Sequence, residues 1–261
     1  MQELQNTSKW HDRILASFIF FTRLPLWRLR QPHVDAYRSV VEHWPLTGWL
    51  TGGMMATTLY LCSLIMPMHI AVLIAISVRL LLTGALHEDG LADFFDGFGG
   101  GSTRQRMLDI MKDSHIGTYG VLGLAMYELL LWNSLCAMPP IIAVLAIIAA
   151  DPYSKMLSAT LANIMPYARK KEEAKAKTIY RKAGTKAWLS LITQGFLPML
   201  PLLIVSHISW IAVMAVPCIS LSVMLCIIWN KLHGYTGDCC GATCLVTELS
   251  VYLTINILTT I

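Results

Sequence analysis

The chain has 261 residues, of which 55% are hydrophobic and 14% charged, with a formal net charge of +4. Soluble domains are typically about 45–50% apolar and about 25% charged. The composition therefore excludes an ordinary soluble domain, whose one core would have to absorb every apolar run, and indicates an integral membrane protein.

The first apolar run, residues 14–21, is too short to cross a bilayer. Thr22, Arg23 and Pro25 follow it, in place of the small residues of a signal-peptide cleavage site. We therefore expect a helix here that lies in the membrane interface or packs against the rest of the molecule.

Longer apolar segments follow along the whole chain. They cover residues 45–66, 68–88, 120–138, 141–165, 188–206, 209–229 and 242–261. About 20 apolar residues are enough for a helix to span the hydrocarbon core. The sequence thus predicts an all-α polytopic membrane bundle of about seven transmembrane helices with interfacial helices, forming a single integral membrane domain over residues 1–261.

The connections between these segments alternate between very short and long. The short ones are residues 67, 139–140 and 207–208, and the long, polar ones are residues 89–119, 166–187 and 230–241. Lys and Arg occur in the long connections and in the N-terminal region but not in the short turns. By the positive-inside rule, the long connections face the cytoplasm. We predict a multi-pass protein of the cytoplasmic (inner) membrane.

An acidic stretch, HEDGLADFFDGFGGG at residues 87–101, follows the second apolar segment. On a helix Asp89, Asp93 and Asp96 fall on one face, and like charges so close repel unless a cation lies among them. Mg²⁺ is usually held by a few carboxylates together with substrate phosphates. We predict a catalytic metal site on these three aspartates, with Asp96 also a candidate general base and Glu88 a further ligand less well placed on the helix.

A second, amphipathic helix is expected from Ser102 onward, lying along the membrane surface beside the acidic stretch. Its basic residues Arg104, Arg106 and Lys112 can offset the carboxylates or hold phosphate oxygens.

The predicted span 141–165 contains Asp151, Pro152 and Lys155. Asp151 and Lys155 are four residues apart, so they can neutralise each other on one helix face. Charged groups at membrane depth are also candidates for function. Both interpretations stay open, as does whether this segment crosses the membrane as one helix.

Two later connections have two explanations each. The basic residues in 166–187 are explained by topology and attraction to anionic lipid headgroups, with contact to substrate phosphates as the alternative. Residues 232–243 form either a tight turn or part of the site. We favour the site, because Thr236 and Asp238 stand among three glycines on the same side of the membrane as the acidic stretch.

These parts suit displacement at a diphosphate. A metal ion neutralises phosphate oxygens, and a carboxylate takes the proton of an attacking alcohol. A nucleotide-activated donor would then leave a phosphodiester and a nucleoside monophosphate, although the residues themselves do not name the donor.

The chain resembles the cobalamin synthase family, the adenosylcobinamide-GDP ribazoletransferases. The resemblance lies in five blocks: FFTRLP (20–25), WPLTG (44–48), TGALHEDGLADFFDG (83–97), RMLDIMKDSHIGTYG (106–120) and GYTGDCCGA (234–242). The family's motif residues fall on Arg23, on Asp89, Asp93 and Asp96, on Asp113 and Ser114, and on Thr236, Gly237 and Asp238. The chain departs from the family pattern at Glu88, His233 and the pair Cys239 and Cys240.

The resemblance implies Mg²⁺-dependent transfer of adenosylcobinamide phosphate from adenosylcobinamide-GDP to α-ribazole or its 5′-phosphate, with release of GMP. The substrate-binding residues would be Arg23, Arg106, Lys112, Asp113, Ser114, Thr236 and Asp238. The expected partners are these small molecules and the lipid bilayer. Nucleic acid is not expected, and a homo-oligomer is left open.

Two other functions fit parts of the sequence. The CDP-alcohol phosphotransferases also use aspartate-bound metals, but their pattern D-G-x-x-A-R is not met by DGLAD at residues 89–93. A divalent-cation transporter would place its site near the bilayer midplane, often within inverted repeats. No convincing internal repeat is present, although Arg79 and Asp151 keep this alternative open.

Overall fold

The computed structural model describes residues 9–169, 180–206 and 208–260. Helices make up most of the described part of the chain, and its only β-type pairing is an isolated bridge between Tyr167 and Tyr235. The α-helices are α1 (Trp10–Phe21), α2 (Trp44–Ser63), α3 (Met68–Thr83), α4 (Leu86–Gly100), α5 (Arg104–Ile110), α6 (Thr118–Cys136), α7 (Pro140–Ile164), α8 (Thr185–Phe196), α9 (Leu200–Ser206), α10 (Trp210–Leu232) and α11 (Gly237–Thr260). The 3₁₀ helices are η1 (Leu26–Arg28), η2 (Val34–His43) and η4 (Leu197–Met199). The predicted all-α class is confirmed.

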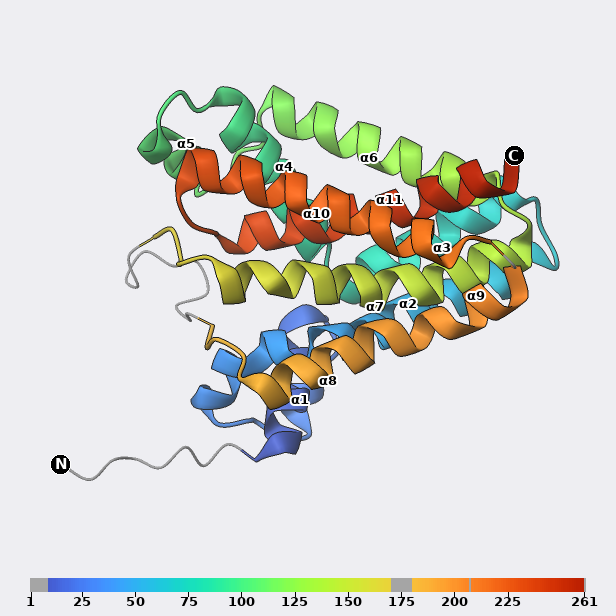
Figure 1. Cartoon of the computed structure of the whole chain (residues 1–261), viewed down its shortest axis with the longest axis horizontal. Coiled ribbons are helices and arrows are strands. Elements are labelled where there is room, and N and C mark those ends of the chain that lie inside the picture. Colours follow the sequence, from blue (N-terminus) through green and yellow to red (C-terminus); the bar gives the residue numbers. More distant parts are fainter. Residues whose placement is uncertain (1–8, 170–179, 207, 261) are drawn as a thin grey trace.

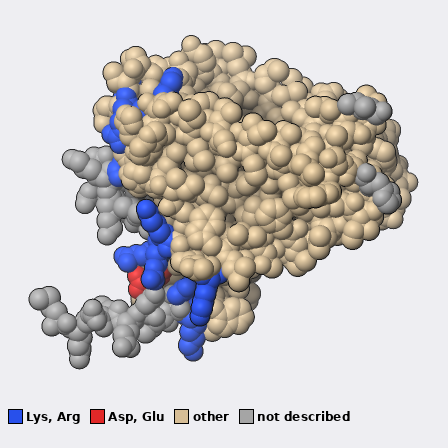
Figure 2. Space-filling model, in the orientation of Figure 1, with Lys and Arg blue, Asp and Glu red and all other residues tan. Residues whose placement is uncertain are grey.

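The longer helices run along the long axis of the molecule, and their connections separate to its two ends (Figure 1). The turns between α2 and α3, α6 and α7, and α9 and α10 lie at the same end as the C-terminus. The α4–α5 corner, the end of α7 and the α10–α11 turn lie at the other end. On the face in Figure 2, the Lys and Arg side chains gather at this second end, which we call the basic end.

Among the described residues, four stretches are long and apolar enough to cross a membrane, namely Pro140–Ile164, Thr185–Ser206, Trp210–Leu232 and Gly237–Thr260. A fifth is formed if α3 and α4, which meet at 89°, count as one broken span. The other two predicted segments are helices, α2 and α6, but polar side chains such as Thr47 and Thr51 in α2 and Glu128 in α6 lower their hydropathy. The several apolar helices fit a multi-pass membrane protein, whereas the predicted number of seven spans is not confirmed.

The central helix is α7, which packs against α2, α8 and α11. Its small residues Ala146, Ala150 and Ser154 are fully buried, and small side chains let neighbouring helices approach closely in a membrane. Asp151 and Lys155 form an ion pair inside this helix, and the Thr51 hydroxyl donates a hydrogen bond of 2.7 Å to Asp151. The predicted neutralisation within α7 is therefore confirmed, and the segment is one unbroken helix.

A second group of buried charges joins α3, α4, α6 and α11. We call Arg79, Glu88, Glu248, Tyr127 and Tyr252 the arginine cluster. The Arg79 guanidinium lies 2.6 Å from a Glu248 oxygen and 3.7 Å from a Glu88 oxygen, and it donates to the Tyr127 hydroxyl at 3.1 Å. The Tyr252 hydroxyl donates to Glu248 at 2.7 Å. These contacts bind four helices together around one buried cation.

The N-terminal helix α1 packs against η2 and α2, which bears out the second of the two expectations for the run 14–21. It begins at Trp10, ahead of the apolar run, and ends at Phe21, whose ring stacks on that of Trp44 at the start of α2 with centroids 4.8 Å apart. This contact brings the first helix to one wall of the site described next.

Candidate active site

A sharp bend between α3 and α4 sets the direction of the acidic stretch. Gly84 and Ala85 both have left-handed backbone angles, with φ of 66° and 55°, a conformation that is strained for a residue with a side chain. The Arg23 N–H donates to the Leu82 carbonyl at 2.7 Å, and the Arg23 side chain lies where a Cβ on Gly84 would be. Arg23 thus covers the bend and leaves no room for a side chain there.

The first turns of α4 and α11 meet backbone to backbone. A Cβ on Gly90 would lie 3.2 Å from the Asp238 Cα, and a Cβ on Gly241 would lie 3.2 Å from the His87 carbonyl oxygen. Asp89 and Asp238 each occupy the first turn of their helix, where unpaired N–H groups give a partial positive charge. The two glycines thus bring two carboxylates and two helix N-termini to one place.

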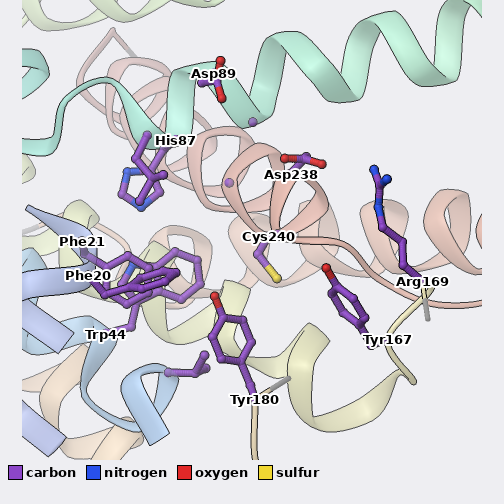
Figure 3. A pocket seen from close by; sticks show the side chains of 15 residues that line it. Phe20, Phe21, Trp44, His87, Asp89, Tyr167, Arg169, Tyr180, Asp238 and Cys240 are labelled. Carbon is purple, nitrogen blue, oxygen red and sulfur yellow. The ribbon is translucent and has the colours of Figure 1, made fainter. Parts of the chain in front are cut away.

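A pocket of about 150 Å³ opens at this crossing (Figure 3). Its walls come from α1, η2, the starts of α2, α4 and α11, and the chain that follows α7. We divide it into a charged compartment, formed by Asp89, Asp238 and Arg169, and an aromatic compartment, formed by Phe20, Phe21, Trp44, His87 and Tyr180.

The charged compartment holds one cation among two acids. Asp89 is exposed and Asp238 is buried. The Nη2 atom of Arg169 is buried and has no hydrogen-bond partner. A buried, unpaired donor is costly, and the donors of a guanidinium match phosphate oxygens. Arg169 is therefore suited to bind an anion that enters this compartment.

The chain that carries Arg169 is fixed to the rest of the basic end. The Ala168 N–H donates to the Tyr235 carbonyl at 2.8 Å, and the Tyr235 N–H donates to the Pro166 carbonyl at 3.0 Å. The Arg104 guanidinium adds hydrogen bonds to the carbonyls of Leu232, at 2.8 Å, and Ala168. Arg104 therefore ties α5 to the end of α10 and to the chain that follows α7.

Burial also acts on a tyrosine beside Arg169. Desolvation raises the pKa of the Tyr167 hydroxyl, and the nearby Arg169 partly offsets this rise. Tyr167 is therefore a neutral hydrogen-bonding group in the wall of the pocket at ordinary pH.

In the aromatic compartment, the rings of Phe21, Trp44 and His87 lie nearly parallel. The interplanar angles are 7° between Phe21 and Trp44, 14° between Trp44 and His87, and 9° between Phe21 and His87. Neither Trp44 Nε1 nor His87 Nε2 has a hydrogen-bond partner, although both atoms are buried. The compartment therefore combines flat apolar faces with two unsatisfied ring nitrogens.

The acids of the predicted metal cluster do not all point to this pocket. Both oxygens of Asp96 accept hydrogen bonds from the start of α6, one from the Gly117 N–H at 2.7 Å and one from the Gly120 N–H at 2.8 Å. Glu88 turns the other way, toward Arg79. Asp93, one helical turn beyond Asp89, is partly buried. The structure thus brings Asp89 together with Asp238, and separates Asp96 and Glu88 from them.

A complete protein cage for a metal ion is not found in the part of the chain that the structure describes, where no three His, Cys, Asp or Glu side chains come close enough together. The predicted metal site is therefore not preassembled from Asp89, Asp93 and Asp96. The physical reason is that shared position on a helix face does not prevent one member, here Asp96, from being bound by a neighbouring helix.

The predicted substrate-binding residues of the 106–114 block lie on the surface. Arg106, Lys112, Asp113 and Ser114 are exposed and do not line the pocket. The His115 side chain and N–H both hydrogen-bond to Asp113, at 2.7 and 3.0 Å, and these contacts lower the pKa of the Asp113 carboxyl.

Thr236 is placed differently, at the entrance to α11. It is buried, and its hydroxyl accepts the Cys239 N–H at 3.3 Å. This is the hydrogen bond of a helix cap, so Thr236 supports the turn that presents Asp238.

The sequence profile described as cobalamin-5-phosphate synthase matches residues 13–256. The chain belongs to this family. A relative from Shewanella baltica, named adenosylcobinamide-GDP ribazoletransferase, is 36% identical over 256 residues, which cover 97% of this chain and 96% of the relative. A relative of the same name from Shewanella oneidensis is 34% identical over 256 residues, covering 95% and 96%. No solved structure matches the chain.

As a member of the cobalamin-5-phosphate synthase family, the protein is a transferase of cobalamin biosynthesis. The resemblance found in the sequence is confirmed by a match that extends over nearly the full chain. This extent favours the family over a CDP-alcohol phosphotransferase and over a cation transporter.

Several pocket residues were not predicted as site residues from the sequence. Phe20, Phe21, Trp44 and His87 lie within the blocks that carry the family resemblance, so position within a motif was their signal. Arg169 was one of many basic residues in its connection. It is distinguished only by the pairing of its chain with Tyr235, which the sequence does not show.

Proposed function

We propose that this protein transfers adenosylcobinamide phosphate from adenosylcobinamide-GDP to α-ribazole, or to its 5′-phosphate, and releases GMP. The observation that carries the proposal is the charged compartment. In it Asp89 and Asp238 come from the first turns of two helices, beside Arg169, whose Nη2 atom has no hydrogen-bond partner, in a chain that belongs to the cobalamin-5-phosphate synthase family.

The donor set of this compartment fits Mg²⁺. Two carboxylates are too few for a metal cage made by protein alone, but Mg²⁺ is usually bound by one or two carboxylates and completed by substrate phosphates and water. Asp89 and Asp238 would hold the ion, and Asp93, one turn further along α4, is a third candidate ligand. When bound, Mg²⁺ neutralises charge on the phosphate oxygens.

The protein's own groups would position the reactants. Arg169 would bind oxygens of the diphosphate, and the N–H groups at the two helix N-termini favour the same negative charge. The acceptor hydroxyl attacks the phosphorus that carries cobinamide, and the bond from this phosphorus to the bridging oxygen breaks. GMP leaves with that oxygen, and a carboxylate of the compartment takes the hydroxyl proton. Asp96 is a poor candidate for this base, because both of its oxygens are already hydrogen-bonded.

We further propose that the protein lies in the inner membrane. Its basic end would then face the cytoplasm. The gathering of Lys and Arg at this end supports the orientation (Figure 2). Alkaline phosphatase joined after Thr260, at the opposite end, is then expected to be active outside the cytoplasm. A fusion protein that is expressed at full length but has no phosphatase activity would show that the protein has the opposite orientation.

The activity is tested with the purified full chain in lipid nanodiscs. It is supplied with adenosylcobinamide-GDP, α-ribazole and Mg²⁺, and GMP release is followed. A parallel sample receives a CDP-activated lipid donor and a lipid alcohol. GMP release that depends on both substrates supports the proposal, whereas release of CMP alone would show that the donor assignment is wrong.

A further inference from the structure

We infer that the aromatic compartment binds the heteroaromatic base of the acceptor, and that the Trp44 indole N–H donates a hydrogen bond to the imine nitrogen of that base. This inference rests on the proposed function, which makes the acceptor a benzimidazole riboside. It goes further by assigning one half of the pocket to one part of one substrate.

The shape of the compartment favours a flat ring. Phe21, Trp44 and His87 present nearly parallel rings, and Phe20 meets Tyr180 edge to face with centroids 6.2 Å apart. The whole pocket, at about 150 Å³, has the volume of an engineered cavity that binds benzene, so it has room for one aromatic ring while the rest of the ligand extends through its opening. Aromatic side chains add favourable ring–ring contact to the burial of apolar area.

The unsatisfied atoms specify the polarity of the ligand. In the described residues, seven buried polar side-chain atoms lack a hydrogen-bond partner, and three of them belong to residues of this pocket: Trp44 Nε1, His87 Nε2 and Arg169 Nη2. Trp44 and His87 are only 2% and 4% exposed. Indole N–H is a donor only, so its missing partner must be an acceptor.

A benzimidazole base meets these requirements better than guanine does. It is a flat, largely apolar ring system with one free acceptor, the imine nitrogen. Guanine also carries an amino group and a ring N–H, three N–H bonds in all, and the one unsatisfied ring nitrogen of His87 could accept at most one of them. The acids of the pocket, Asp89 and Asp238, lie in the charged compartment (Figure 3). The guanosine of the donor would therefore lie outside the aromatic compartment, and the acceptor base inside it.

The division of the pocket also explains how the two reactants meet. With the base in the aromatic compartment, the attached ribose would extend toward the charged compartment of Asp89 and Arg169, where the diphosphate would be held. Fixing both reactants in this way converts the reaction into an effectively intramolecular one.

The test compares two ligands on three proteins. The ligands are α-ribazole and its indole analogue, in which a C–H group replaces the imine nitrogen. The proteins are the wild type, Trp44→Phe, which keeps the ring but loses the N–H, and Trp49→Phe. The last is a matched control on the same helix, because the Trp49 N–H donates to the Gln194 carbonyl away from the pocket. Binding is measured by equilibrium dialysis against the full chain in nanodiscs, with and without GMP as competitor.

The wild type is expected to bind α-ribazole about threefold to tenfold more tightly than the indole analogue, the range for one hydrogen bond. Trp49→Phe is expected to keep this preference and Trp44→Phe to lose it. GMP is expected not to displace α-ribazole. Equal binding of the two ligands to the wild type, or an unchanged preference in Trp44→Phe, would overturn the inference. So would displacement by GMP together with weaker GMP binding to Trp44→Phe, which would assign the compartment to guanine.

These outcomes are separate from failure of the proposed function, because dialysis needs no turnover. A protein that binds α-ribazole with the expected preference but releases no GMP contradicts the proposed function alone. A protein that turns over normally with no preference that depends on Trp44 contradicts this inference alone. If α-ribazole does not bind the free protein measurably, the same preference is taken from kcat/KM for the two acceptors.

Discussion

Buried polar groups are arranged differently in the middle of the bundle and at the pocket. In the middle, Arg79 is surrounded by Glu248, Glu88 and Tyr127, and Lys155 is paired with Asp151. Arg79 Nε and Glu88 Oε2 lack hydrogen-bond partners of their own, but both atoms belong to ion-paired side chains. At the pocket, nitrogens of Arg169, Trp44 and His87 are buried without a hydrogen-bond partner. Since burial of an unpaired polar group costs stability, the first arrangement serves the fold, and the second is the kind that a ligand completes.

A buried charge in a membrane protein is therefore not by itself evidence of a functional site. Arg79 and Asp151 kept a transporter function open in the sequence because they lie within apolar segments. Their contacts account for them as links between helices. What distinguishes the site is that three side chains with unpartnered nitrogens line one cavity together with two carboxylates. Substitutions in the two regions test this difference.

Removal of the central cation should give the largest effect. Arg79→Met leaves Glu248 and Glu88 buried without their counter-charge, and breaking a buried ion pair in this way costs about 3–5 kcal/mol. We expect a large fall in the apparent Tm in detergent or nanodiscs. Arg38→Met is the control, because Arg38 is exposed and its pairing with Asp35 at 3.5 Å lies on the surface. Equal losses in the two variants would show that the arginine cluster does not stabilise the bundle.

The next largest effect is expected on activity alone. Asp89→Asn removes a carboxylate from the charged compartment, and loss of one charge-stabilising group typically lowers kcat by about 100-fold to 1000-fold. GMP release should fall by this factor while the Tm stays within a degree or two of wild type. Asp109→Asn, on the exposed face of α5, should keep wild-type turnover. Normal turnover in Asp89→Asn would remove Asp89 from the site.

Arg169→Gln should separate binding from folding. The substitution removes an unpaired buried nitrogen, so the Tm should not fall, whereas KM for adenosylcobinamide-GDP should rise about tenfold through loss of a charged hydrogen bond. Arg181→Gln, in the same basic connection but exposed, should leave KM unchanged. A drop in Tm without a change in KM would make Arg169 a structural residue like those of the arginine cluster.

A smaller effect is expected at Asp96. In the wild type the Asp96 carboxylate accepts hydrogen bonds from two backbone N–H groups. Asp96→Asn places its own amide N–H against one of these donors. Loss of such a helix-capping contact costs about 1–2 kcal/mol. Stability should therefore fall, while the Mg²⁺ concentration needed for half-maximal turnover stays at the wild-type value. Thr103→Ala is the control, because it removes the side-chain cap of α5 and so lowers stability in a similar way at a helix other than α6. A raised Mg²⁺ requirement only in Asp96→Asn would return Asp96 to the metal site.

The sequence predicted much of the fold for identifiable reasons. Apolar runs of sufficient length define helices whatever their neighbours, so the helices over 141–165 and 209–229 were predicted closely. The bend at Gly84 was not, because the apolar run 68–88 continues through it, and the left-handed angle at Ala85 leaves no mark in hydropathy. The predicted number of seven spans is not confirmed: α3 and α4 form one bent pair, and the polar side chains of α2 and α6 lower the hydropathy of those helices.

The site was predicted in part. Asp89 and Asp238 were both named, yet their proximity depends on the contact between Gly90 and Gly241, residues 151 positions apart in number. Helix periodicity placed Asp96 on the same face as Asp89 but gave no information on α6, whose N–H groups bind it. Local pattern therefore identified which residues carry charge, and tertiary contact decided which of them face the pocket.

The smallest effect concerns His43, which is half-buried at the junction of η2 and α2, next to the pocket residue Trp44. Burial, with a smaller contribution from Arg13, lowers the pKa of His43 to about 4. The unfolded chain binds a proton near pH 6.5 and the folded chain does not, so His43 contributes full stability above that pH and loses it as the pH falls toward 4. Between pH 6.5 and 5.5 this amounts to about 1 kcal/mol.

The measurement is the shift in apparent Tm between these two pH values for the wild type and for His43→Gln. The variant cannot titrate but can still meet Gln194, whose amide lies 3.4 Å from the His43 ring in the wild type. Burial raises the pKa of Glu42, the preceding residue. This raised pKa increases stability as the pH falls, opposite to the effect of His43, but it is present in both proteins. The variant should therefore lose less stability than the wild type on acidification, and equal shifts would show that His43 is not held in its neutral form.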